Sequence, residues 1–113
     1  MESWRLPEIS TPEGTRSPVV LKSEDEARAV LIGIDAGQKL GDHQVKEHAF
    51  VLVLEGTVQV EAGAESLDAG EGTLLLFQPE ERRALSSRDG ARMLLVLAPW
   101  PAPGHYRGGD EQP

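Results

Sequence analysis

Two of the three histidines in this 113-residue chain, His43 and His48, lie five residues apart in the segment HQVKEH, and Glu47 directly precedes the second. Neutral imidazoles bind Mn, Fe, Ni or Zn, and two of them with a carboxylate make a common open metal site. The same groups also suit a ligand pocket, as a base or as hydrogen-bonding groups. This segment is therefore the first candidate for chemistry.

Spacing alone does not bring these groups together. Along one continuous strand, His43 and Glu47 share a face but stand roughly 13 Å apart, and His43 and His48 point to opposite faces. A metal site requires the chain to turn between residues 44 and 47, where the sequence has neither Gly nor Pro.

Composition excludes several other kinds of site. The chain has no cysteine, so disulfides, thiolate metal sites and cysteine nucleophiles are ruled out. No GxSxG elbow, P-loop or dinucleotide fingerprint occurs. The formal net charge of −8 disfavours nucleic acid as a partner, because nucleic-acid binding needs a basic surface. No apolar run has the length of a signal peptide or a membrane span, so we expect a cytoplasmic protein without a membrane partner.

The elements that would position these residues are strands. Six short apolar runs, each bounded by Gly, Asp, Glu or Pro, predict an all-β sandwich or barrel; they cover residues 19–21, 29–34, 49–54, 57–62, 73–77 and 93–98. Two of them, AFVLVL and MLLVLA, are apolar on both faces, which predicts a covering layer outside the barrel. We expect the core to be lined by Val51, Val53, Val58, Val60, Leu74, Leu76, Leu94 and Val96.

Residues 17–98 form the predicted barrel domain. Residues 1–16 read as an extended arm in which Trp4 docks on a neighbouring surface, and residues 99–113 as a tail rich in Pro and Gly, from which Trp100 and Tyr106 could cover the barrel. SEDEARAV at 23–30 is the one stretch that could begin a helix. LEGTVQV is the clearest hairpin signal, with Gly56 at the bend.

The run from His43 through AFVLVLEGTVQV, followed by GTLLLFQPEERRAL, resembles the small single-domain cupins over roughly residues 30–98. The resemblance implies a double-stranded β-helix, or jelly-roll, barrel in which three histidines and a glutamate hold a divalent metal. The scaffold positions fall on Gly56, Gly72 and Pro79. His43 matches the first metal ligand.

The other metal-ligand positions depart from the family pattern. The second histidine falls on Val45, the glutamate on Ala49 or on a neighbour such as Glu47 or His48, and the last histidine on Arg83. A guanidinium has no lone pair for a metal, so an inward-facing Arg83 would favour Glu47 or a bound anion. Alternatively, EERR at 80–83 is a solvated turn. The segments HQVKEHA and WPAPGHY also look like a group of uncharacterised bacterial small cupins.

Three functions follow as hypotheses. The favoured one is a small-molecule binding or sensing barrel with a degenerate metal site, in which His43, Glu47 and Arg83 bind the ligand. The alternative is a metal-dependent oxygenase, isomerase or lyase with His43 and either His48 or Glu47 as ligands to Mn, Fe, Ni or Zn. The third is a metal-free isomerase or cyclase with His43 as general base and Arg83 stabilising an enolate or carboxylate. Apolar outer faces also predict a homodimer.

Overall fold

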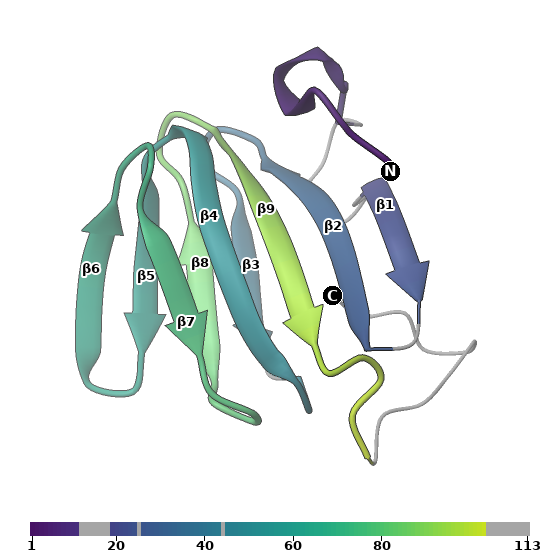
Figure 1. Ribbon diagram of the computed structural model, residues 1–113. Coiled ribbons are helices and arrows are strands. Elements are labelled where there is room, and N and C mark those ends of the chain that lie inside the picture. The colour runs from purple at the N-terminus through teal and green to yellow at the C-terminus, as the bar shows by residue number, and fades with distance from the viewer. Residues whose placement is uncertain (12–18, 25, 44, 104–113) are drawn as a thin grey trace.

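The computed structural model consists of two antiparallel β-sheets packed face to face (Figure 1). It describes residues 1–11, 19–24, 26–43 and 45–103, and the side chains of residues 41–43 lie outside this description. These residues contain no helix long and apolar enough to cross a membrane. After the short 3₁₀ turn Leu6–Glu8 the strands are β1 Val19–Glu24, β2 Ala27–Ile34, β3 Lys39–His43, β4 His48–Gly56, β5 Val58–Ala62, β6 Glu65–Ala69, β7 Leu74–Phe77, β8 Arg83–Ser86 and β9 Ala91–Ala98.

The large sheet has the order β1-β2-β9-β4-β7 and the small sheet the order β3-β8-β5-β6. Consecutive strands therefore often lie in different sheets, and β9 pairs with both β2 and β4 although they precede it by many residues. This alternation between two sheets is the predicted jelly-roll arrangement. All six apolar runs are strands, as the sequence predicts.

The core lies between the sheets, and buried residues alternate with less buried ones along β4, β5 and β9. On β9, Met93, Leu95 and Leu97 are buried, and the residues between them are only partly buried. Val51, Val53, Val58 and Val60 belong to this core, as predicted.

The other half of the predicted lining was wrong. Leu74 and Leu76 are 62% and 47% exposed, and Leu94 and Val96 point with them to the outer face of the large sheet. In a continuous apolar run, a shift of one residue exchanges the two faces, and no polar residue within Leu74–Phe77 or residues 93–98 marks the outer one. The flanking Arg92, which shares the face of Leu94 and Val96, was the available signal.

Two local predictions were also wrong. Residues 23–24 end β1 and residues 27–30 begin β2, and these two strands pair with each other, so these residues are not helical. LEGTVQV is not a hairpin, because β4 pairs with β7 and β9 whereas β5 pairs with β6 and β8. Gly56 does adopt a positive φ of 78°, and it carries the chain from one sheet to the other.

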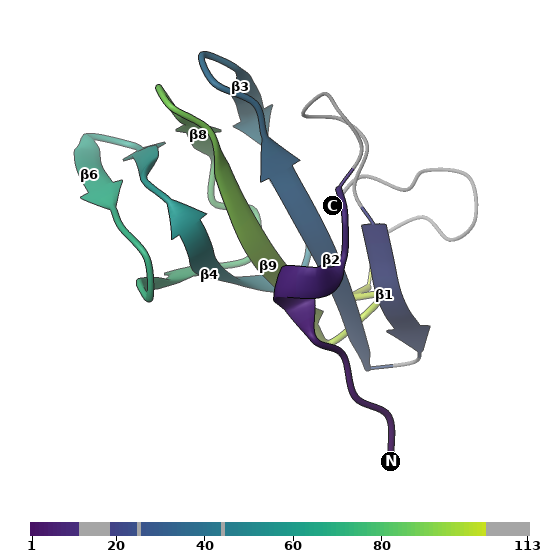
Figure 2. The ribbon, with the colours of Figure 1, turned by 90° about the horizontal axis from the view of Figure 1, so that it is seen from above.

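The N-terminal arm, as far as it is described, crosses the outer face of the large sheet at β2 and β9 (Figure 2). Arg92 donates hydrogen bonds to the carbonyl oxygens of Leu6 and Ile9. Its pairing partner Gly33 leaves room for Thr11, whose Oγ1 would lie 2.6 Å from a Cβ added at Gly33. Trp4 is 42% exposed, and residues 12–16 of the predicted arm lie outside the described residues.

Candidate functional site

The candidate residues gather at one end of the barrel, where β4 and β8 begin and β7 and β9 end (the lower end in Figure 1). We call this the site end. His43, the last residue of β3, is the Cα partner of Arg83, the first residue of β8. Glu47 directly precedes β4. The fold thus brings the backbones of these three residues to the same end, and the His43 side chain lies outside the described ones.

The chain does turn between His43 and His48. It leaves the small sheet after His43, bends at Lys46 and Glu47, and enters the large sheet at His48. The turn needs neither Gly nor Pro because partners outside the segment hold it. The Val45 carbonyl accepts a 2.6 Å hydrogen bond from the backbone N–H of Glu80. The Lys46 ammonium lies 3.1 Å from the Glu80 carboxylate.

Glu47 and His48 leave this turn in opposite directions. Glu47 is 0% exposed, and its Oε2 accepts a 3.0 Å hydrogen bond from the backbone N–H of Ala102. His48 is partly buried and alternates with the fully buried Ala49, so it lies on the outer face of the large sheet. The two side chains do not come together. Among the described residues, no group of three His, Asp or Glu side chains could hold a metal.

Arg83 points into the barrel. It is 4% exposed, and its guanidinium carbon lies 5.1 Å from the centroid of the Phe77 ring. Nε and Nη1 are buried and have no hydrogen-bond acceptor among the described residues. Loss of hydration by burial lowers the pKa of Arg83, and the nearby negative charge of Glu81 opposes that shift. Of the EERR segment, Arg83 turns inward while Arg82 remains exposed.

A strap formed by residues 99–102 closes part of the site end. Trp100 packs in the core, and the Arg28 guanidinium lies 4.7 Å from the centroid of its ring. The Trp100 carbonyl accepts a hydrogen bond from Glu26, and Ala102 donates to Glu47 as described above. Trp100 therefore covers the barrel, as predicted. Tyr106 lies outside the described residues.

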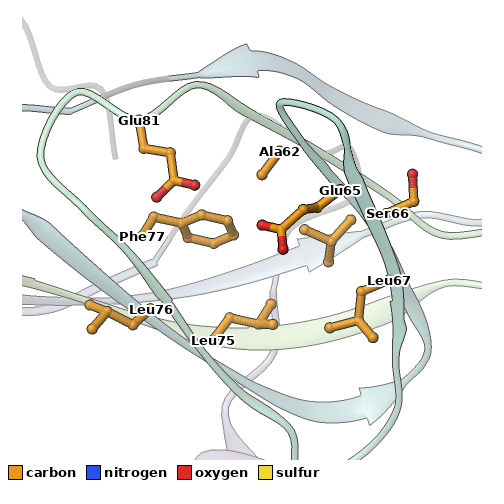
Figure 3. Close-up of a pocket in the computed structure, with 9 residues that line it drawn as sticks. Ala62, Glu65, Ser66, Leu67, Leu75, Leu76, Phe77 and Glu81 are labelled. Atoms are coloured by element: carbon orange, nitrogen blue, oxygen red, sulfur yellow. The ribbon is translucent and has the colours of Figure 1, made fainter.

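The site end also has an open part, between the β5–β6 hairpin and β7. A pocket of about 290 Å³ lies there, and Phe77 forms part of its wall (Figure 3). Val60 and Leu75 add apolar surface, while Glu65 and Glu81 add carboxylates. This combination of apolar walls and a few polar groups is typical of small-molecule sites.

The metal-ligand positions of the cupin pattern do not suit a metal in this chain. Val45 and Ala49 are buried and apolar, and Arg83 offers only N–H donors and a positive charge. Glu47, the nearest carboxylate, already accepts the Ala102 hydrogen bond. The described side chains at these positions therefore do not fit the family's metal.

Sequence reasoning missed two buried polar residues, Arg28 and Ser87. Arg28 lies in a charged stretch that suggests a solvated segment, but it alternates with the inward-facing Val30 and Ile32, which is the signal that could have identified it. The Ser87 hydroxyl donates to the Thr57 carbonyl at 2.7 Å and accepts from the Gly90 N–H at 3.1 Å. Nothing in the local sequence distinguishes it from a loop serine.

Comparison with solved structures shows the same fold in several proteins. An RmlC-like cupin protein from Desulfovibrio desulfuricans matches with a TM-score of 0.77 and 20% identity, over 88% of this chain and 97% of the other. The TT1209 protein of Thermus thermophilus matches with a TM-score of 0.76 and 21% identity, over 88% and 98% of the two chains. A protein with a double-stranded β-helix domain from Klebsiella pneumoniae matches with a TM-score of 0.77 and 15% identity, over 90% and 93%.

Among curated proteins, none matches this chain. The family model of the AraC-like ligand-binding domain matches residues 28–97. That range runs from Arg28 on β2 to Leu97 on β9 and so includes both sheets and the site end. The chain has a cupin fold and belongs to the AraC-like ligand-binding domain family.

Proposed function

We propose that this protein binds or senses a small organic molecule at the site end, and that Arg83 donates hydrogen bonds to an oxygen of that molecule. The observation that carries the proposal is the buried Arg83 guanidinium, whose Nε and Nη1 have no acceptor among the described residues. A ligand carboxylate or phosphate is a suitable partner for such a group. His43 and Glu47 complete the proposed set, since both lie at the same end.

The energetic reason is the cost of burying a charge. A buried donor left without an acceptor costs about 1–3 kcal/mol, and more when it is charged. Stacking on Phe77 and the negative charge of Glu81 offset only part of this cost. A bound oxygen atom would supply the acceptor that the described residues do not provide.

The alternative of a metal-dependent enzyme has less support. It would need lone pairs where Val45, Ala49 and Arg83 stand, and His48 lies on the outer face. Elemental analysis of protein purified without chelator tests this point. About one equivalent of Mn, Fe, Ni or Zn per chain that is lost in His43→Ala would favour the enzyme over our proposal.

The proposed binding is tested by thermal denaturation with a panel of small carboxylates and inorganic phosphate. We expect at least one to raise the melting temperature in a concentration-dependent way, as mass action requires. Arg83→Met should abolish that rise, and Arg82→Met, which removes an exposed neighbouring charge, should keep it. Equal responses of the two variants, or no response to any compound, would overturn the proposal.

We also propose that two copies of the chain pair through the outer face of the large sheet. Strand register aligns two rows of apolar residues across this face, Leu31–Leu94–Leu52–Leu74 and Ala29–Val96–Phe50–Leu76. The exposed end of these rows lies on β4 and β7, where Phe50, Leu74 and Leu76 are 37%, 62% and 47% exposed. Neither row contains a charge, so a second copy of the same face can cover it without burying an ion. The second copy would then be the covering layer that the apolar outer faces of AFVLVL and MLLVLA predict.

A further inference from the structure

Arg28 is the second guanidinium buried at the site end. It lies near the start of β2, is 7% exposed, and alternates with the inward-facing Val30 and Ile32. The Trp100 ring covers one face of its guanidinium, 4.7 Å from carbon to centroid, and the N–H groups lie along the edge of that plane. Its Nε is buried and has no acceptor among the described residues. Arg28 and Arg83 therefore both favour an oxygen acceptor inside the barrel.

Strand pairing places Arg28 and Arg83 at the same level of the barrel, although they come from different sheets. Arg28 on β2 pairs with Leu97 near the end of β9. Leu97 pairs in turn with Ala49 on β4, and Ala49 with Phe77 on β7. These four side chains are buried and form one row across the inner face of the large sheet. Arg83, from β8 of the small sheet, stacks on Phe77 at the other end of this row.

The row has a guanidinium near each end and an apolar middle. Three strand spacings separate Arg28 from Phe77, which is roughly 14 Å between backbones. Leu97 and Ala49 lie between them, and both are completely buried. A molecule that lies over these two residues would have Arg28 at one end and Arg83 at the other. Such a molecule needs an apolar body and an oxygen atom at each end.

The buried charges at this end favour an anion. The described residues bury three charged side chains, Arg28, Arg83 and Glu47. Two positive charges and one negative charge give a sum of +1, and the Glu47 carboxylate is held against the strap by the Ala102 N–H. A ligand with at least one negative charge therefore lowers the electrostatic cost of burying both guanidinium groups, whereas a cation would raise it.

We infer that Arg28 is a second binding residue and that the ligand is a small acid with oxygen-bearing groups at both ends. The inference rests on the proposed function and names its class of ligand. One carboxylate meets Arg83, and a second carboxylate, or a neutral hydroxyl or keto oxygen, accepts a hydrogen bond from Nε of Arg28. The two arginines then select the length of the ligand as well as its charge, because both ends must reach a donor at once.

Calorimetric titration with three series of unbranched acids tests this inference. The dicarboxylates from malonate to adipate are compared with the monocarboxylates and the ω-hydroxy acids of the same chain length. We expect one dicarboxylate or hydroxy acid to bind at least about tenfold more tightly than the matching monocarboxylate, as a hydrogen bond to a charged group provides. Arg28→Met should remove most of this preference, because it weakens only the ligands that have a group for Arg28.

Two further variants make the result specific to Arg28. Arg88→Met is the matched control and should keep the full preference, since Arg88 is exposed between β8 and β9, at the opposite end of the barrel. Arg28→Lys replaces Arg28→Met if the latter does not fold. It keeps the positive charge but not the Nε–H, so it should lose most of the preference as well.

Several outcomes would overturn the inference. Equal binding of all three series to the unaltered protein would do so and leave the proposed function intact, since one carboxylate on Arg83 would then be enough. A preference that persists in the Arg28 variants would show that another residue binds the second group, and an equal loss in Arg88→Met would show that only net charge matters. No binding by these acids or by inorganic phosphate would overturn both the inference and the proposed function.

Discussion

The Arg83 guanidinium packs on the Phe77 ring, 5.1 Å from carbon to centroid, inside the barrel. This contact places a permanent positive charge behind the wall of the pocket. In the proposed function, the burial of Arg83 serves ligand binding at the expense of stability, since a desolvated charge opposes folding.

Arg83→Met should therefore stabilise the free protein while removing ligand binding. Methionine keeps most of the volume and carries no charge, so we expect the free energy of unfolding to rise by roughly 1 kcal/mol or more. Urea denaturation measures it, with Arg82→Met as the exposed control. A loss of stability in Arg83→Met would indicate that the guanidinium is well compensated without a ligand.

Replacement of the two tryptophans should have very different effects. Trp100→Ala removes a core side chain and the ring beneath Arg28, and should cost about 3–5 kcal/mol. Trp4→Ala changes an exposed side chain of the arm and should stay within about 0.5 kcal/mol. Chemical denaturation of both variants checks this, and similar losses would contradict the role of the strap.

Two glycines with positive φ provide a matched pair at the turns. Gly56 and Gly63 have φ of 78° and 62°, so alanine at either position should cost roughly 1–2 kcal/mol in backbone strain. A Cβ at Gly56 would also overlap the Gly90 carbonyl oxygen, whereas a Cβ at Gly63 meets nothing within 4 Å. Gly56→Ala should therefore lose more stability, by roughly a further 1–3 kcal/mol. Equal losses in urea denaturation would argue against the close contact.

The arm should detach when Gly33 acquires a side chain. Gly33→Val places atoms where Thr11 lies, so trypsin should cleave after the exposed Arg5 several-fold faster than in the unaltered protein. Gly70→Val is the control, because no atom lies within 4 Å of a Cβ there. Thr11→Gly should restore slow cleavage to Gly33→Val; if it does not, the valine acts on the sheet and not on the arm.

Dimer formation should depend on the outer face of the large sheet. Solution scattering should give twice the chain mass, and Leu74→Lys should weaken association at least about tenfold, equivalent to roughly 1.4 kcal/mol. Leu67→Lys is a fair control, since Leu67 is 52% exposed but lies on β6 in the small sheet. A monomeric mass for the unaltered protein would end this proposal.

The fold was predictable from the sequence where apolar residues are continuous. Every apolar run is a strand, whereas β3, β6 and β8 were missed because KLGDH, ESLDA and RALS are short and at least half polar. Pairing was less predictable, because Gly56 produces the same positive φ in a hairpin and in a crossover. Only contacts between residues far apart in sequence distinguish a hairpin from a crossover.

The site was predictable only in part, because the direction and burial of its side chains depend on contacts between residues far apart in sequence. The lack of a lone pair on Arg83 follows from its chemistry, but its inward direction depends on the register of β8 against β3 and β5. Glu47 follows the exposed Lys46, and its complete burial depends on the strap more than 50 residues later in the chain. From the local sequence, a charged residue near a turn is expected to be exposed to solvent. Only a contact with a segment distant in sequence shows that it is buried.

The place of β9 in the large sheet has a consequence for how the protein is made. Ribosomes synthesise β2 and β4 long before Ala91–Ala98, yet both strands take β9 as a neighbour. Until then their inner edges offer unpaired backbone groups and apolar side chains to solvent, a state prone to aggregation. We therefore expect the nascent chain to depend on chaperones, and the completed chain to fold slowly, because its sheet closes through contacts far apart in sequence.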